Sequence, residues 1–416
     1  MSSVPVRPAG RAVAVTDVVE RYLELGLRLG RHVDGFVDAY YGPRELAARV
    51  DAEPLRPPAE LVGDAGRLVA DLDAGVDAEQ VDAGRRRWIR AQALGARTSA
   101  GALAAATDPQ REPIGYLDEV ERCYGARPAR VPEDDFAAAH ARLDTVLPGD
   151  GPLRERYISW REAHAVPPER LEPAIRSLAD DLRERTQRLF GLPEGEHVEW
   201  IFETDKPWAG FNYYEGGLRS RVAINVDLPV LSLSLGHLVA HEAYPGHHTE
   251  HTRKEVGLVR SRRWLEETIF LVGTPQCTMA EGLADLGAEV AYGPRPEPIV
   301  AEHLAPLGVR YDAEVAAAVT DAAETLSWVR SNAAILLHDE GVPTDDVIAY
   351  LERWALLPRA RAEKAMAFMT DPTWRAYSHT YTEGLRLCRG FVDGDPARFE
   401  QLITEQMLPG DLAPAA

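Results

Sequence analysis

The stretch HEAYPGHH, residues 241–248, gathers the side chains of this sequence that are best suited to chemistry. His241 and Glu242 are adjacent, as in zinc-binding helices where a histidine holds the metal and a glutamate lies beside it. The second histidine of such a helix stands four residues after the first, and here that position is Pro245. Because proline cannot donate to the His241 carbonyl and its ring clashes with it, a regular helix must fail between the histidines.

A bulge offers a way around this break. If two residues are looped out, His247 reaches the place of the usual second histidine, and Gly246 can adopt the backbone angles that the bulge needs. We therefore predict His247 as the second metal ligand. On an undistorted helix His248 would be the better match, since seven residues make nearly two turns. His237 could also pair with His241 without a bulge, although a core histidine with satisfied hydrogen bonds is the commoner fate.

The third ligand is expected from a helix over residues 277–289, CTMAEGLADLGAE. Glu281, Asp285 and Glu289 are spaced four apart and share one helical face. Burying carboxylates among Leu, Ala and Gly is costly unless a metal or hydrogen bonds compensate. We predict Glu281 as the ligand and Asp285 as the group that orients a ligating histidine. An exposed acidic helix face is the alternative.

A second cluster, WRAYSHTYTEGLRLCRG, lies near the C-terminus at residues 374–390. Tyr377 and Tyr381 are one turn apart, with His379 and Arg386 nearby. Amide hydrolysis needs a donor aimed at the developing oxyanion, and a tyrosine or a histidine can provide it. Tyrosines on amphipathic helices usually pack, so this cluster gains meaning only beside the metal site.

Helices are expected to position these groups. Residues 16–49 and the Ala-rich segments up to about residue 190 show helical periodicity interrupted by Pro and Gly. β-Branched and aromatic residues then predict a small antiparallel sheet over residues 197–204, 208–217 and 219–227. Asp227 is the expected cap of the metal-binding helix, and helix continues from there to about residue 407.

The expected fold is therefore mainly α, with a small antiparallel sheet before the metal-binding helix. We divide it into an N-terminal helical lobe, 1–195, and a catalytic metal-binding lobe, 196–416. Both lobes can belong to one bilobed domain.

Composition limits the partners. The formal net charge of −20 argues against nucleic acid. No apolar run is long enough for a signal-peptide core or a membrane span, so we expect a cytoplasmic protein without membrane contact. The three cysteines, Cys123, Cys277 and Cys388, lie far apart and suit core positions in a reducing compartment. The oligomeric state stays open, a homodimer included.

Taken together, these motifs resemble the bacterial family called domain of unknown function 885. Its hallmark is His-Glu-x-x-Pro-Gly-His followed by a Glu-Gly pair, and both parts lie within residues 197–390 here. The sequence is more distantly similar to helical zinc carboxypeptidases of the carboxypeptidase Taq type. It departs from the family pattern at three positions: Glu250 in place of Gln, Leu283 in place of an aromatic residue, and Thr382 in place of a basic residue.

The resemblance implies a helical zinc-peptidase-like fold with a deep groove, a single Zn²⁺ and peptidase activity. Carried over by position, His241, His247 and Glu281 would be the ligands. Glu242 would be the general base and Tyr381 the oxyanion donor.

The substrate side is expected to involve the small sheet and an arginine. FNYYEGG, with Tyr213 and Tyr214, and the following strand would offer an extended peptide an edge to pair with. Arg219, Arg221 or Arg386 could bind a terminal carboxylate bidentately, which would make the enzyme an exopeptidase.

The leading hypothesis is a zinc-dependent amide-bond hydrolase acting on a peptide or small amide, with Glu242 as the base for metal-activated water. Two histidines and one carboxylate also describe a non-heme iron oxidase or oxygenase, but such an enzyme has no need of a base at position 242. A non-catalytic metal-binding protein is the third reading. Structural zinc usually has four protein ligands, which are often cysteines. No cysteine lies near residues 241–248, which speaks against a structural zinc site.

Overall fold

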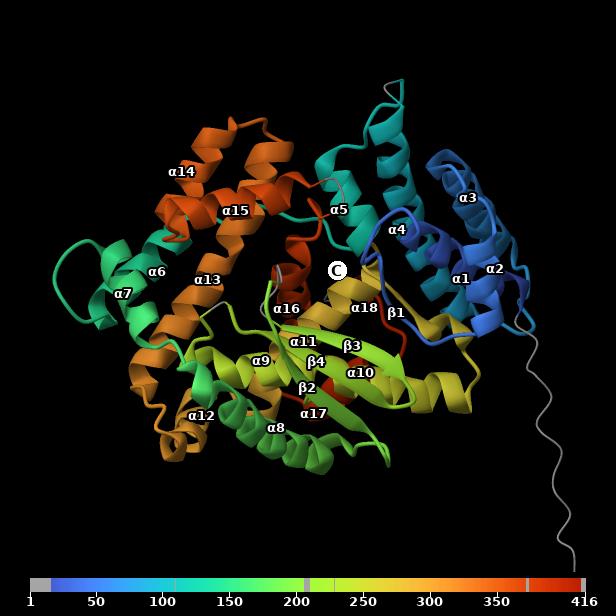
Figure 1. The fold of residues 1–416 in the computed structure, drawn as a ribbon. Coiled ribbons are helices and arrows are strands. Elements are labelled where there is room, and N and C mark those ends of the chain that lie inside the picture. Colours follow the sequence, from blue (N-terminus) through green and yellow to red (C-terminus); the bar gives the residue numbers. More distant parts are fainter. Residues whose placement is uncertain (1–15, 109, 206–209, 228, 372–373, 413–416) are drawn as a thin grey trace, which may run out of the picture.

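The structure is a computed structural model that describes residues 16–108, 110–205, 210–227, 229–371 and 374–412. Helices dominate it, and two small sheets lie among them (Figure 1). This confirms the mainly α fold.

The N-terminal part packs as a helical group around a short strand. Its elements are α1 (Asp17–Gly30), β1 (Val37–Tyr40), α2 (Arg44–Ala52), α3 (Pro58–Ala74), α4 (Ala83–Thr107) and α5 (Tyr116–Tyr124). The helix predicted over residues 16–49 is present only in part, because α1 ends at Gly30 and α2 begins at Arg44. After α1 the chain turns through Gly35, whose φ is +78°, and enters β1. β1 pairs antiparallel with β5 (Ile269–Leu271), a partner more than 200 residues away that local periodicity cannot reveal.

A second helical group stands on the opposite side of the molecule in Figure 1, where α6 packs against the long α13. Its elements are α6 (Glu133–Val146), α7 (Leu153–Ala163), α12 (Glu297–Leu304), α13 (Ala313–His338), α14 (Thr344–Trp354) and α15 (Arg359–Thr370). α8 (Pro168–Phe190) runs along the lower edge and leads into the larger sheet.

The larger sheet is mixed, which corrects the prediction of an antiparallel sheet. Its strands are β2 (His197–Glu203), β3 (Gly210–Gly216) and β4 (Arg219–Asn225), in the order β2-β4-β3. β3 and β4 form the expected antiparallel hairpin, whose turn places Gly216 and Gly217 at positive φ. β2, however, pairs with β4 in parallel.

The helices that carry the candidate site follow this sheet in the chain. They are α9 (Leu235–Glu242), α10 (His247–Lys254), α11 (Pro275–Tyr292) and α16 (His379–Val392), followed by α17 (Pro396–Thr404) and α18 (Pro409–Leu412). Asp227 does not cap the metal-binding helix. Its carboxylate accepts a hydrogen bond from the Asp205 backbone instead, and α9 begins eight residues later, after a 3₁₀ turn.

Packing crosses the expected boundary at residue 195. Ile269 and Leu271 of β5 are buried in the same apolar cluster as α1, α3 and α4. A second cluster joins α5, α6 and α7 to α13, α14 and α15. The three cysteines are free and buried, as expected. Among the described residues, no helix is long and apolar enough to cross a membrane.

Candidate metal centre

A sharp turn after Glu242 separates α9 from α10. α9 ends at Glu242 and α10 begins at His247, so the two histidines lie at the facing ends of two helices. Gly246 fits the turn because a Cβ there would lie 2.0 Å from the His241 carbonyl oxygen. The Gly246 amide donates to the Ala240 carbonyl at 2.9 Å, which holds the turn in place. The break that proline and glycine predict is therefore present.

The turn brings His247 to His241. Their Nε2 atoms lie 3.1 Å apart, and Glu281 Oε2 of α11 lies 3.5 Å from His241 Nε2. The three donor atoms all lie within 4.8 Å of one another. Glu281 Oε2 is buried and has no hydrogen-bond partner. Without a cation one imidazole must donate to the other and this oxygen stays unpaired, whereas one bound ion would satisfy all three atoms.

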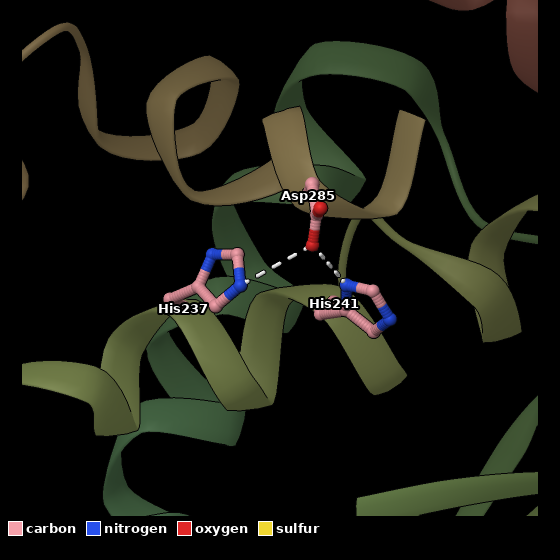
Figure 2. Close-up of side chains that lie close together, drawn as sticks. All are labelled: His237, His241 and Asp285. Atoms are coloured by element: carbon pink, nitrogen blue, oxygen red, sulfur yellow. Dashed lines mark hydrogen bonds and ion pairs between the residues drawn. The ribbon is translucent and has the colours of Figure 1, made fainter. Parts of the chain in front are cut away.

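Asp285 orients His241 from the other side of its ring. Its Oδ1 atom lies 2.8 Å from His241 Nδ1 and 3.3 Å from His237 Nε2, between the two rings (Figure 2). The bond to Nδ1 fixes the tautomer that leaves Nε2 free to bind a metal. His237, His241 and Asp285 could also hold an ion. In this second group, however, the Asp285 carboxylate already accepts from two N–H donors, and His237 is half exposed. The buried group of His241, His247 and Glu281 is therefore the better site for a metal ion.

The carboxylates of Asp285, Glu242 and Glu281 favour a positive charge at His241. Burial alone would lower the pKa of His241, but the Asp285 hydrogen bond and the nearby acids raise it to about 10. Burial also raises the pKa of Glu281, to about 8, and lowers that of His247 well below its usual range. These shifts place protons on His241 and Glu281 near neutral pH, and a bound cation would displace them. The two imidazoles and the carboxylate that remain match the donor set of a catalytic zinc site. The residues therefore fit the ion that the sequence predicts.

Glu242 lies next to the metal ligands and below the start of β3. Its side chain is buried, and burial raises its pKa despite the opposing effect of His241. A Cβ at Gly210 would lie 2.9 Å from Glu242 Oε1, so the glycine makes room for the carboxylate. The Asn212 side-chain amide donates to the Glu242 carbonyl at 2.6 Å and ties β3 to the end of α9.

Asp38 is a second carboxylate near Glu242, and no sequence pattern singled it out. The pairing of β1 with β5 shifts register between Val37 and Ala39, which makes Asp38 the extra residue of a bulge. Bulges of this kind re-aim side chains next to active sites. Burial, followed by the negative charge of Glu242, raises the pKa of Asp38 to about 7.

α16 and the turn before it bring two tyrosines to the metal ligands: Tyr381 lies in the helix, and Tyr377 lies in the turn. The Tyr377 hydroxyl donates to Glu281 Oε1 at 2.8 Å, which orients this carboxylate toward His241. The Tyr381 ring packs edge-on against Tyr377 with centroids 5.5 Å apart, and its side chain is 42% exposed. Tyr381 is thus partly open to solvent, although burial raises the pKa of its phenol well above the usual value, while Tyr377 is held on a ligand.

Glycines allow α16 to come this close to α11. A Cβ at Gly282 would lie 2.2 Å from the Gly384 carbonyl oxygen, and one at Gly384 would lie 2.4 Å from the Thr278 carbonyl. The glycine that follows Glu281 in the sequence motif therefore has a steric role.

A cavity of about 740 Å³ adjoins the site. His237 and Asp285 line it, as do Arg161 of α7 and Ser327 of α13. This volume is within the usual range of small-molecule sites.

His248 lies away from the metal centre. It is fully buried, with Nε2 2.8 Å from Glu196 and Nδ1 2.7 Å from the Ser220 hydroxyl. Burial lowers the pKa of His248, so the neutral ring donates from Nε2 to Glu196 and accepts from Ser220. The undistorted-helix alternative, with His248 as a ligand, is therefore wrong.

The other expected substrate residues are spread over the structure. His379 is buried in the core, where its Nε2 lies 3.0 Å from the Tyr116 hydroxyl. Tyr214 is buried too and donates to Glu255. Arg386 pairs with Glu383 at 2.8 Å.

The hairpin of β3 and β4 and the helix α11 hold the remaining candidates. Tyr213 stacks under Arg221, with the guanidinium carbon 5.0 Å from the ring centre. Arg219 is exposed at the start of β4, and Glu289 of α11 pairs with Arg389. The structure brings none of these residues to the metal ligands.

Comparisons with known proteins point to the fold alone. No protein-family model and no curated protein matches the chain. Among solved structures, it is similar to the "putative lipoprotein" from Colwellia psychrerythraea, with a TM-score of 0.54 and 15% identity over 85% of this chain. The chain spans 65% of the length of that protein. It is also similar to a "putative lipoprotein of unknown function" from Shewanella oneidensis, with a TM-score of 0.47 and 14% identity over 95% of this chain and 82% of the other. At 15% identity, the similarity to the Colwellia protein shows a shared fold.

Proposed function

We propose that this protein is a zinc-dependent amide-bond hydrolase, most specifically a metallopeptidase. The observation that carries the proposal is the group formed by His241, His247 and the unpaired Glu281 oxygen, with Glu242 directly after the first histidine. The motif resemblance to the domain of unknown function 885 family supports the same reaction class. We also propose that it works in a reducing compartment, the cytoplasm, which suits three free buried cysteines.

A zinc ion held by these three residues would polarise the scissile carbonyl and acidify a water molecule. Glu242 takes a proton from that water as its oxygen forms a bond to the carbonyl carbon. The Tyr381 hydroxyl donates to the oxyanion that develops. Glu242 then passes the proton to the amide nitrogen, the C–N bond breaks, and an acid and an amine leave.

The other residues keep this arrangement rigid. Asp285 holds the His241 ring, and Tyr377 holds Glu281. β3 is an edge strand of its sheet and starts beside Glu242, so an extended peptide paired with it would pass over the metal ligands.

Elemental analysis of the protein purified without chelators tests the proposal. We expect near-stoichiometric zinc in the wild type and in Glu242→Gln, and its loss in His247→Ala. Glu242→Gln should also abolish hydrolysis of a peptide library. Iron in place of zinc would favour the oxidase reading, and a metal-free wild type would reject the hydrolase.

A further inference from the structure

An aromatic cluster extends from the metal ligand Glu281 toward solvent. At its centre is Tyr377, whose hydroxyl donates to Glu281 Oε1 at 2.8 Å. Three rings meet the Tyr377 ring nearly edge-on, namely Tyr381 with centroids 5.5 Å apart, Trp374 at 5.7 Å and Phe368 at 6.4 Å. Edge-on contacts at these distances are a favoured geometry of aromatic pairs. The aromatic cluster therefore begins on the metal site itself and has a defined arrangement.

Two outer rings of the aromatic cluster are open to solvent. Phe368 of α15 and Tyr381 of α16 are each 42% exposed. Five large apolar side chains are exposed in the described part of the chain, and the other three are Leu55, Leu189 and Val226. Those three belong to other elements and loops. Single exposed apolar residues are normal, whereas two exposed rings that share one tyrosine beside a metal site point to a ligand.

Trp374 supports Phe368 from a second side. The two rings are nearly parallel, with an angle of 16° between their planes and centroids 6.4 Å apart. The indole also lies against the turn after α1, where a Cβ at Gly35 would be 3.7 Å from it. Phe368 is thus held by Trp374 and Tyr377. A side chain that is already held in one place loses little entropy when a ligand packs on it.

We propose that Phe368 and Tyr381 bind an aromatic or large apolar side chain of the substrate, in a residue next to the scissile amide. This inference rests on the proposed function. Each of the two rings is one ring contact away from Tyr377, which touches the metal ligand Glu281. A peptide that presents its carbonyl to the metal ligands therefore carries the neighbouring side chains past these rings. Covering them removes apolar surface from water, and an aromatic partner adds ring contacts.

Tyr381 can serve both the side chain and the reaction. A tyrosine has an apolar ring and a polar tip, so its ring can contact a substrate side chain while its hydroxyl donates to the oxyanion. The same position argues against a permanent protein partner on these rings. A partner seated there would cover the candidate oxyanion donor, whereas a substrate needs to be exactly this close to it.

The test uses the zinc-loaded full-length protein and one cleaved peptide chosen from a library. The residues on either side of its cleaved bond are replaced, one at a time, by Phe, Ala or Glu. At one of the two positions we expect a kcat/KM about 30-fold higher for Phe than for Ala. The Glu peptide examines a rival reading, because the cation Lys364 lies one turn before Phe368 on the same face of α15.

Variants at Phe368 connect this preference to the aromatic cluster. Phe368→Ala should lower the preference for Phe to about 3-fold, mainly through a higher KM for the Phe peptide, and should keep its zinc. Phe368→Leu should retain part of the preference, and it carries the test if Phe368→Ala loses zinc. Leu55→Ala removes another exposed apolar side chain and is the matched control, with the preference of the wild type.

Binding without turnover gives a second measurement. Zinc-loaded Glu242→Gln should hold the peptides uncleaved, and calorimetry should show a Kd about 10-fold lower for the Phe peptide than for the Ala peptide. Adding Phe368→Ala to this variant should remove most of the difference.

The outcomes separate the two proposals. Zinc-dependent cleavage with equal rates on the Phe and Ala peptides, a preference that survives in both Phe368 variants, or a preference for Glu overturns this inference and leaves the hydrolase intact. A dimer that separates in Phe368→Ala without a change in preference would assign the rings to an interface between copies and overturn it too. No cleavage of any library peptide by the zinc-loaded wild type rejects the proposed function and this inference with it.

Discussion

His247 and His248 are neighbours in sequence with opposite surroundings. His247 faces His241 across the turn, and His248 is enclosed by Glu196 and Ser220 beneath the sheet. The sequence could favour His247 because Pro245 and Gly246 forbid a regular helix. It could not show what His248 does, since its partners lie 28 and 52 residues away.

His248→Ala should therefore keep zinc and lose stability. We expect the free energy of unfolding at pH 7 to fall by about 1–3 kcal/mol, because Glu196 loses a buried hydrogen-bond donor. Denaturant unfolding with parallel zinc analysis measures both quantities. Zinc loss equal to that of His247→Ala would contradict this role.

The stability deficit of His248→Ala should also depend on pH. Burial would raise the pKa of Glu196, but hydrogen bonds from His248 and Tyr244 lower it to about 2. A carboxyl group whose pKa falls on folding stabilises the protein above its ordinary pKa and loses this effect as the pH falls through the folded value. The difference between variant and wild type should thus shrink between about pH 4.5 and pH 2.

Asp38 gives a prediction for the pH dependence of activity. Glu242 must be ionised to act as a base, so kcat/KM falls when the pH drops through its pKa. The negative charge of Asp38 disfavours ionisation of Glu242, and Asp38→Asn should move this acid limb to lower pH. The pH profile of kcat/KM measures the shift, and the exposed Asp34→Asn serves as control. An unchanged limb would mean that the two carboxylates are not coupled.

At the scale of elements, the contact of α11 with α16 sets the position of Tyr381 and of the turn that holds Tyr377. The i, i+4 spacing of Glu281 and Asp285 was enough to predict which side chains of α11 face the histidines. The close approach of α16 was not predictable, because it depends on Gly282 and Gly384 meeting across more than 100 residues. The parallel pairing of β2 and the bulge at Asp38 likewise depend on distant strands.

Gly384→Ala should separate these two helices. Its new methyl group would meet the Thr278 carbonyl, and we expect a loss of about 1–3 kcal/mol in stability together with a lower kcat as Tyr381 moves. Gly390→Ala on the same helix is the matched control. No atom lies within 4 Å of its new Cβ, so it should be neutral or stabilising by up to about 1 kcal/mol. Equal effects of the two substitutions would contradict the steric role.

At the scale of the whole molecule, the metal ligands bridge separate parts of the chain. α9, α10 and α11 each contribute one ligand, and β1 from the N-terminal part adds Asp38 beside them. A sequence divided at residue 195 suggests two lobes, but the core clusters join both parts. Packing between distant segments is what local patterns do not encode.

Zinc should therefore stabilise the entire fold. An ion that binds only the folded state adds about 2.7 kcal/mol when its free concentration is 100 times its Kd. We expect thermal unfolding of the wild type to move to higher temperature with added zinc, and that of His247→Ala to stay unchanged. A similar rise in both proteins would indicate binding elsewhere.

The hydrogen bond between Tyr377 and Glu281 joins residues that are 96 positions apart in the chain. During synthesis the metal ligands leave the ribosome well before α16 is made. A nascent chain can thus gather its histidines and Glu281 while it still lacks the segment that carries Tyr377 and Tyr381. In the proposed mechanism, hydrolytic activity would then begin only after α16 has been made, so the order of the sequence itself would delay the enzyme until both tyrosines can join the metal ligands.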